Sequence, residues 1–224
     1  MTLSGWTLAF DLDGTLVETA PDLLGSLNAV LVEQGLPSVP MSSARHLVGR
    51  GVRVMLEHGF AEAGATFDAV RDAGLMDRFI DIYLGRIADE SHIYPNVIEV
   101  LQTFAAQGAR LVVVTNKRTD LSLALLNALD LARRFDAVVG PDLVSARKPS
   151  GAHLKEAVES VGGDPARCLM VGDSAPDVAT ARALGAPVIV TSYGYTDPPA
   201  ADLGADAVID DFDQLPAWVA RLTA

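Results

Sequence analysis

Phe10-Asp11-Leu12-Asp13-Gly14-Thr15-Leu16-Val17 is the stretch from which the architecture of this 224-residue chain is inferred. The apolar run from Trp6 to Phe10 is short enough for a buried strand, and Gly14 allows a sharp turn just beyond the carboxyl end of that strand. Two carboxylates are thereby held at one edge of a sheet. Because like charges this close disfavour joint ionisation, the pair indicates a divalent cation or a shared proton. A solvated loop with ordinary surface acids is the alternative interpretation.

The composition excludes several classes of protein. Hydrophobic residues make up 50% of the sequence, enough for a well-buried core, and the formal net charge of -12 argues against a surface for nucleic acid or anionic membranes. Cys168, the one cysteine, lies in an apolar run and is expected to be buried, so no disulfide framework is predicted. The sequence shows neither an export signal nor an apolar run of transmembrane length. We therefore expect a cytoplasmic globular protein, a monomer or homodimer, that binds a small molecule and neither nucleic acid nor membrane.

The segment between Val17 and about Ser91 has the periodicity of helices and no convincing strand signal. Apolar residues at helical spacing predict helices over 21–34, 42–47, 52–58, 66–73 and 75–84. The break Gly49-Arg50-Gly51 inside this helical block places one cation where the backbone is unusually free. A plain turn between two helices is the alternative interpretation of the break.

Strands and helices alternate from Ile93 onward. The predicted helices span 95–107, 120–129, 151–161, 176–184 and 215–222, and the predicted strands span 110–115, 137–140, 168–171, 187–191 and 207–209. Such alternation is typical of βαβ units, which form a parallel sheet with helices on both faces. The sequence therefore predicts an α/β fold with a Rossmann-like parallel sheet core over 1–16 and 92–224. The helical block, 17–91, is then a domain inserted after the first strand.

Polar residues follow the predicted core strands or a nearby loop at four places. These are Asp11 with Asp13, Thr115-Asn116-Lys117, Lys148-Pro149, and Gly172-Asp173-Ser174-Ala175-Pro176-Asp177. Because the carboxyl ends of parallel strands meet at one edge of a sheet, we expect the four groups to converge. Together they offer acids for a divalent cation, a hydroxyl and an amide for a phosphate, and a lysine as compensating charge. That combination indicates phosphoryl transfer.

The order and spacing of these groups resemble the haloacid dehalogenase-like hydrolase superfamily. Its four motifs run DxDGT, a Thr or Ser ending the second strand, a Lys, and an acidic GD...D signature. The resemblance covers nearly the whole chain, and the helical block matches the all-helical cap of the C1 type inserted between the first two motifs. Asp11 to Leu23, Leu47 to Gly51 and Gly172-Asp173-Ser174 are most similar to bacterial phosphoglycolate phosphatases. Glu18-Thr19 departs from that family, which usually has Asp-Ser there.

The resemblance implies a role for each motif. Asp11 would be the nucleophile that forms an aspartyl-phosphate, and Asp13 would be the acid that protonates the leaving group and then the base that activates water. Thr115 and Asn116 would donate hydrogen bonds to the phosphoryl oxygens. Lys148 would balance the charge of the nucleophile and the phosphate.

The resemblance also implies a Mg²⁺ ion, held by the carboxylate of Asp11, the main-chain carbonyl of Asp13, and Asp173. Asp177 would be a further ligand or would support one, unless it is simply a carboxylate favoured by the dipole at a helix N-terminus. Lys117, in contrast, is expected to be a solvated surface lysine.

We therefore predict a Mg²⁺-dependent phosphatase of a small phosphorylated metabolite, which converts 2-phosphoglycolate to glycolate and phosphate. Specificity is expected to come from the helical block. There, Arg50 is the cation best placed to bind the substrate carboxylate, and Arg45 and Arg53 are its competitors. The alternatives are a phosphatase of another sugar or organic-acid phosphate, or phosphoglucomutase-type transfer to a sugar.

Other classes of protein fit the sequence less well. A non-enzymatic receiver-like module phosphorylated on Asp11 would leave Asp13 and the helical block without a purpose. A phosphonate-cleaving relative needs a lysine in the helical block, but the sequence has lysine only at positions 117, 148 and 155. The histidines, at positions 46, 58, 92 and 153, are scattered singly in surface or core settings, although His46 could approach a substrate.

Overall fold

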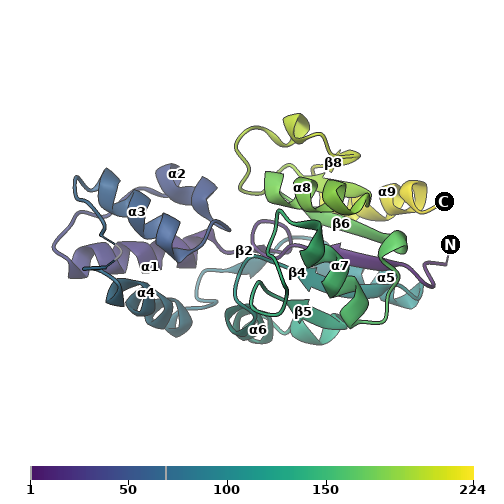
Figure 1. The fold of residues 1–224 in the computed structure, drawn as a ribbon, viewed down its shortest axis with the longest axis horizontal. Coiled ribbons are helices and arrows are strands. Elements are labelled where there is room, and N and C mark those ends of the chain that lie inside the picture. The colour runs from purple at the N-terminus through teal and green to yellow at the C-terminus, as the bar shows by residue number, and fades with distance from the viewer. Residues whose placement is uncertain (1, 69) are drawn as a thin grey trace.

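The computed structural model describes residues 2–68 and 70–224 and is built around a six-stranded sheet (Figure 1). The strands are all parallel and lie in the order β5-β4-β1-β6-β7-β8. Their bounds are β1 (Thr7–Phe10), β4 (Arg110–Val114), β5 (Ala137–Val139), β6 (Cys168–Gly172), β7 (Val188–Thr191) and β8 (Ala207–Ile209). The strands are mostly apolar because both faces of a parallel sheet are buried.

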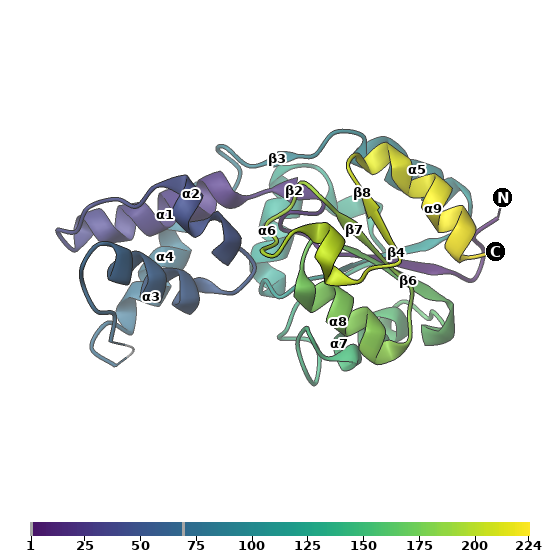
Figure 2. The same ribbon diagram turned by 90° about the horizontal axis from the view of Figure 1, so that it is seen from above.

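Helices cover both faces of this sheet, and Figure 2 shows α5 and α9 on the side opposite α7 and α8. The first face is covered by α5 (Val97–Ala106), α6 (Thr119–Ala128) and α9 (Leu215–Leu222), the second by α7 (Gly151–Ser160) and α8 (Ala175–Leu184). Successive strand residues point to opposite faces, so Phe10 packs in one apolar cluster and Ala9 in the other. The predicted α/β fold with a Rossmann-like parallel sheet is confirmed.

Short 3-10 helices complete the connections around the sheet: η2 (Ala132–Arg134), η3 (Pro165–Arg167), η4 (Ala200–Leu203) and η5 (Phe212–Gln214). Within the described part of the chain, none of the helices combines the length and apolar character that a bilayer span requires.

A group of helices stands at the end of the molecule opposite the two termini (Figure 1). We call it the helical insertion, and it comprises α1 (Ala20–Glu33), α2 (Met41–Ala44), η1 (Arg45–Leu47), α3 (Val52–Glu62) and α4 (Gly74–Gly85). It buries Leu27, Leu56 and Phe79 in an apolar cluster separate from the two that flank the sheet. The domain limits themselves, 1–16 with 92–224 against 17–91, stay a prediction.

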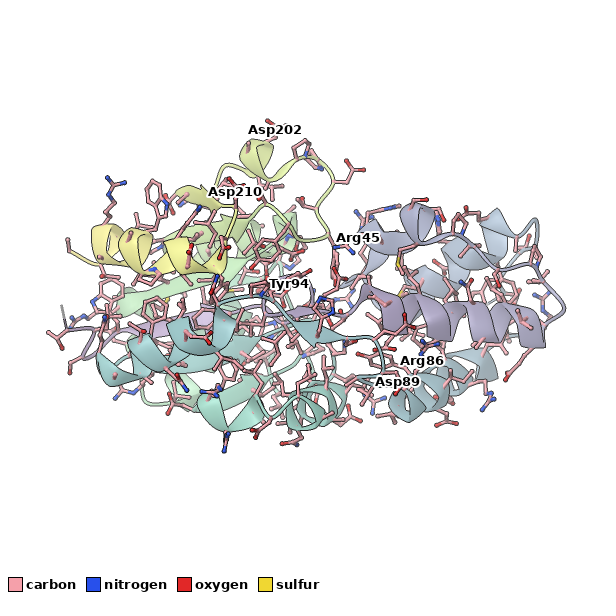
Figure 3. All side chains as sticks on the ribbon, turned by 180° about the vertical axis from the view of Figure 1, so that it is seen from behind. Arg45, Arg86, Asp89, Tyr94, Asp202 and Asp210 are labelled. Carbon is pink, nitrogen blue, oxygen red and sulfur yellow. The ribbon has the colours of Figure 1, made fainter. Side chains whose placement is uncertain are left out.

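The chain enters and leaves the helical insertion along two short strands. β2 (Val17–Glu18) pairs antiparallel with β3 (His92–Ile93). Beside them, the fully buried carboxylate of Asp22 accepts hydrogen bonds from the N–H and hydroxyl of Ser91 and from the guanidinium of Arg86. Figure 3 shows Arg86 at the base of the insertion, near this junction. These contacts tie the start of α1 to the segment that returns to the sheet.

Two sequence-based predictions for this region are wrong. Val17 begins a strand where none was indicated, because a two-residue strand is too short to show alternation. The predicted helix over 66–73 is absent from the described residues of that range, 66–68 and 70–73, which form loop and turns. There the Asp68 carboxylate accepts hydrogen bonds from the N–H groups of Val70 and Arg71, and such side-chain contacts compete with helix formation.

Candidate active site

Three polar residues lie at the carboxyl ends of adjacent strands. Asp11 directly follows β1, Thr115 follows β4, and Asp173 follows β6. Because β1 pairs with both other strands, the chain leaves all three at the same edge of the sheet. The side chains of all three residues are buried. The structure therefore brings the predicted motifs together as parallel-sheet topology requires.

A glycine is required at position 14, in the turn after Asp11 and Asp13. Gly14 has a φ of +84°, a conformation that residues with a side chain rarely adopt. A Cβ atom at this position would lie 2.5 Å from Oδ2 of Asp173. Gly14 therefore lets the first motif pack directly against the fourth.

Lys148 lies among the acidic side chains of the site. Its Nζ atom is 2.8 Å from Oδ1 of Asp11 and 2.7 Å from Oδ1 of Asp177, and 3% of its side chain is exposed. Burial alone would lower the pKa of this lysine, but the charges of Asp11 and Asp177 more than offset that effect and raise the pKa. Lys148 therefore remains a cation and offsets the charge of its two neighbours.

Both carboxylate oxygens of Asp177 have partners within the protein. Oδ1 accepts a hydrogen bond from Lys148, and Oδ2 accepts the N–H groups of Asp173 and Ser174 and the Ser174 hydroxyl. Asp177 thus completes a capping box at the start of α8, which matches the helix N-terminal interpretation. It also holds Lys148 and the Asp173 loop in place, while its role as a metal ligand stays a prediction.

The carboxylates are close enough to share a cation. Asp11, Asp173 and Asp177 each place one carboxylate oxygen so that the three lie within 4.8 Å of one another. Burial raises the pKa of Asp11 to about 7, with Lys148 opposing the rise and Asp177 adding to it. Burial, Asp177 and Asp11 likewise raise the pKa of Asp173 well above its usual range. More positive charge than Lys148 supplies would stabilise this cluster, and oxygen ligands suit Mg²⁺, so the donor set fits the predicted ion.

Lys117 is not the surface lysine that the sequence predicts. Its side chain is 7% exposed, and its Nζ atom lies 2.7 Å from Oδ1 of Asp13. The same oxygen accepts a hydrogen bond of 2.7 Å from the hydroxyl of Thr19. Tyr83 of α4 covers Lys117, with its ring centroid 4.9 Å from the ammonium nitrogen. The sequence could not reveal this burial, because the covering helix belongs to the distant helical insertion.

Tyr195 is a site residue that the sequence analysis missed. Its N–H donates a hydrogen bond of 2.6 Å to Oδ2 of Asp173, and its hydroxyl donates one of 2.7 Å to Oε1 of Glu18. Arg45 pairs with Glu18 and places its guanidinium 4.7 Å from the centroid of the Tyr195 ring, at the junction seen in Figure 3. Tyr195 follows β7 at the same sheet edge, so the rule that located Asp173 could have located it.

Thr115 and Asn116 begin the loop after β4. The Thr115 hydroxyl oxygen accepts the N–H of Lys117 at 3.1 Å, which leaves its proton free for donation to a ligand. The Asn116 side-chain amide donates to the main-chain carbonyl of Lys148 at 3.2 Å and so joins the second and third motifs. Their contacts with a phosphate stay a prediction.

A cavity of about 70 Å³ gathers the predicted site residues. Its wall includes Asp11, Asp173 and Arg50. Arg50 is exposed in the loop between η1 and α3, and the glycines on either side of it have φ values of 84° and 98°. Asp177 does not line the cavity, but it contacts Lys148, which does.

His153 is a buried histidine of the core. Its Nδ1 accepts the N–H of Lys148 at 3.1 Å, and its Nε2 lies 3.1 Å from the carbonyl oxygen of Val139. This pairing requires a neutral ring with its proton on Nε2. Burial lowers the pKa of His153 from 6.5 to about 4.

This pKa predicts a loss of stability in mild acid. Between pH 6.5 and about 4 the unfolded chain binds a proton at this side chain and the folded chain does not, so the free energy of unfolding should fall by up to roughly 3 kcal/mol as the pH drops. Above pH 6.5 the full contribution of the neutral His153 ring to the free energy of unfolding is present. Urea unfolding at a series of pH values would measure it, with His153→Gln as the comparison. The variant should lose this part of the pH dependence, whereas equal slopes in the two proteins would contradict the assignment.

Comparisons with known proteins show to which family this chain belongs. Residues 8–191 match the family model described as haloacid dehalogenase-like hydrolase. The chain belongs to the haloacid dehalogenase-like hydrolase family. This hydrolase is 52% identical over 223 residues to a phosphoglycolate phosphatase of Caulobacter vibrioides, with 99% of this chain and 94% of that protein covered.

Two further comparisons agree. A phosphoglycolate phosphatase of Mesorhizobium japonicum is 43% identical, with 96% of this chain and 94% of that protein covered. A crystal structure described as a predicted phosphoglycolate phosphatase from Haemophilus somnus has a TM-score of 0.90 at 30% identity, covering 98% of this chain and 99% of that one. The family and the enzyme class predicted from the sequence, a phosphoric monoester hydrolase, are confirmed.

Proposed function

We propose that this hydrolase is a Mg²⁺-dependent phosphatase that converts 2-phosphoglycolate to glycolate and phosphate through an aspartyl-phosphate on Asp11. The observation that carries the proposal is the buried contact of 2.8 Å between the Lys148 ammonium and the Asp11 carboxylate, at the sheet edge where Asp13 also lies. A carboxylate alone would repel a phosphate. The neighbouring ammonium offsets that repulsion, so the nucleophile can approach phosphorus.

In the first half of the reaction, a carboxylate oxygen of Asp11 attacks phosphorus, and the bond between phosphorus and the leaving oxygen breaks. Lys148 offsets the negative charge that gathers as nucleophile and phosphate meet. The protonated carboxyl of Asp13 gives its proton to the leaving oxygen, so glycolate departs with a neutral hydroxyl. The hydroxyl of Thr115 and the amide of Asn116 orient the phosphoryl oxygens.

In the second half, the Asp13 carboxylate takes a proton from water while the water oxygen attacks phosphorus. The bond between phosphorus and the Asp11 oxygen then breaks, which releases phosphate and restores the nucleophile. Lys117 and Thr19 both contact Oδ1 of Asp13, so Oδ2 is the oxygen left to carry the proton. A Mg²⁺ ion bound by Asp11, Asp173 and the Asp13 carbonyl would supply further charge stabilisation for the phosphoryl oxygens.

The choice of 2-phosphoglycolate rests on the relatives that are named phosphoglycolate phosphatase, at 52% and 43% identity. This choice can be tested by measuring kcat/KM for a panel of phosphorylated metabolites. The panel includes glucose 1-phosphate as a test for transfer to a sugar. We expect 2-phosphoglycolate to give the highest value. A higher value for a sugar phosphate, or recovery of a sugar bisphosphate as product, would contradict the proposal.

The proposed metal site makes a prediction about ion removal. A chelator should stop turnover and Mg²⁺ should restore it, while Ca²⁺ should inhibit because its larger coordination shell misplaces the phosphate. Asp173→Asn should raise the Mg²⁺ concentration for half-maximal activity by about tenfold or more and change KM less. Titration of each protein with Mg²⁺ would measure both effects. Full activity in excess chelator would show that the carboxylate cluster does not need a metal.

A further inference from the structure

A second cavity, of about 240 Å³, adjoins the one that contains Asp11. Asp13, Gly49 and Asn116 line both cavities, so the two spaces meet beside the proposed acid. Most of the wall of the second cavity is apolar and comes from the helical insertion and α6. These apolar residues include Leu23, Met55, Met76, Phe79 and Leu121.

Lys117 is the buried cation of this second cavity. Arg118, which also lines it, keeps 55% of its side chain exposed and pairs with Asp120. A lysine side chain is a cation at neutral pH, and the Nζ atom of Lys117 forms an ion pair of 2.7 Å with Oδ1 of Asp13 while lying 4.9 Å from the ring centroid of Tyr83. Lys117 is therefore an ammonium group inside a largely apolar space, where it attracts an anion more strongly than in water.

The polar groups around Lys117 have unused hydrogen-bonding capacity. An ammonium has three N–H donors, and within residues 2–68 and 70–224 the one acceptor that meets hydrogen-bond geometry is Oδ1 of Asp13. The hydroxyl of Tyr83, a residue 1% exposed, lies beside the Lys117 ammonium but makes no hydrogen bond of good geometry within the same residues. A buried donor without an acceptor costs free energy. The Lys117 ammonium and the Tyr83 hydroxyl together therefore indicate a ligand with an oxygen acceptor.

The proposed reaction determines which ligand group reaches this place. If Asp13 protonates the leaving oxygen, that oxygen lies within hydrogen-bond reach of Asp13. The rest of the leaving group then extends away from the cavity that contains Asp11, where the phosphoryl group would bind. In 2-phosphoglycolate one methylene separates the leaving oxygen from the carboxylate. A carboxylate this close to the leaving oxygen lies beside Lys117, which contacts the same Asp13 side chain at 2.7 Å.

We propose that Lys117 binds the carboxylate of the substrate's leaving group, with the Tyr83 hydroxyl as a second donor. The inference rests on the proposed phosphatase function and assigns its specificity to a residue of the sheet domain. Arg50, which the sequence analysis favoured for this contact, lines the cavity of Asp11 and Asp173 and does not line the second one. Arg50 therefore lies on the side of Asp13 where the phosphoryl group would bind, and not on the side of the leaving group.

The test compares two substrates that differ in the carboxylate alone. Ethyl phosphate replaces the carboxylate of 2-phosphoglycolate by a methyl group. The measured quantity is the ratio of kcat/KM for 2-phosphoglycolate to kcat/KM for ethyl phosphate. Lys117 also holds Asp13, so Lys117→Met should slow both substrates, but the ratio cancels that shared loss.

Lys117→Met should lower this ratio by at least about tenfold, the effect of losing a charged hydrogen bond, and Lys117→Arg should retain most of it. Tyr83→Phe, which removes one oxygen and keeps the apolar packing, should lower the ratio by about threefold or more. Circular dichroism establishes that each variant is folded. If Lys117→Met does not fold, Lys117→Gln and Tyr83→Phe carry the test with the same expectations.

Several results would overturn the inference. An unchanged ratio in folded Lys117→Met would do so, and a ratio that collapses in Arg50→Ala alone would move the carboxylate site to Arg50. A wild-type ratio near one would show that the enzyme is a phosphatase without a carboxylate site, which overturns this inference and leaves the phosphatase reaction standing. Failure of the wild-type protein with Mg²⁺ to hydrolyse either ester would instead overturn the proposed function.

Discussion

Asp11→Asn is expected to reduce kcat for 2-phosphoglycolate by more than about 10³-fold. An amide oxygen is a poor nucleophile toward phosphorus and a weak metal ligand, so the substitution removes the phosphoryl acceptor. The fold should survive, because the amide has nearly the shape of the carboxylate and Asp11 lies in the cavity wall. Steady-state rates at saturating substrate and Mg²⁺ would measure the loss.

A matched control separates this effect from a general loss of acidic charge. Asp202, on η4, is exposed, and Figure 3 shows it on the short helix at the top of the view and not at the junction that Arg45 marks. Asp202→Asn removes the same charge and should leave kcat within about twofold of the wild-type value. If Asp11→Asn retained about a tenth of wild-type kcat, the assignment of the nucleophile would be wrong.

Asp13→Asn is expected to lower kcat by roughly 10²- to 10⁴-fold, the usual range for loss of a proton-transferring group. The asparagine carbonyl oxygen can still accept the hydrogen bonds that Lys117 and Thr19 now give to Oδ1 of Asp13. The site should therefore keep its shape and lose mainly proton transfer. Because p-nitrophenol needs no proton to depart, formation of the aspartyl-phosphate from p-nitrophenyl phosphate should suffer least.

A series of esters with leaving groups of increasing pKa would test this second prediction. In Asp13→Asn, the rate of the first chemical step should fall more steeply with leaving-group pKa than it does in the wild-type enzyme. An equal loss for every ester would mean that Asp13 acts on the metal or on the fold and not as the acid.

The sheet and the residues at its edge could be predicted from the sequence because both follow from local patterns. These patterns are short apolar runs and the order in which strands and helices alternate. Apolar runs such as Arg110–Val114 and Cys168–Gly172 are strands, and parallel topology requires that Asp11, Thr115 and Asp173 meet beyond their carboxyl ends. These inferences needed only the order of elements along the chain.

The contacts between the helical insertion and the sheet could not be predicted in the same way. Lys117 is buried because Tyr83 of α4 covers it, and no local pattern relates two residues so far apart in the sequence. In the sequence Glu18 stands out only as a departure from a family pattern, yet in the structure it accepts hydrogen bonds from Arg45 and Tyr195 on opposite sides of the junction. Such pairings depend on how the insertion packs against the sheet.

The central claim is that the phosphoryl group is carried by Asp11. The most direct test mixes Asp13→Asn with p-nitrophenyl phosphate and Mg²⁺, quenches the reaction in acid within the first turnover, and locates the phosphoryl group by peptide mass spectrometry. This variant can expel p-nitrophenolate but lacks the base that activates water, so the intermediate should accumulate. We predict a burst of p-nitrophenol matched by an equal amount of phosphoryl group on Asp11. A burst with the phosphoryl group on another residue, or with none on the chain, would contradict the account.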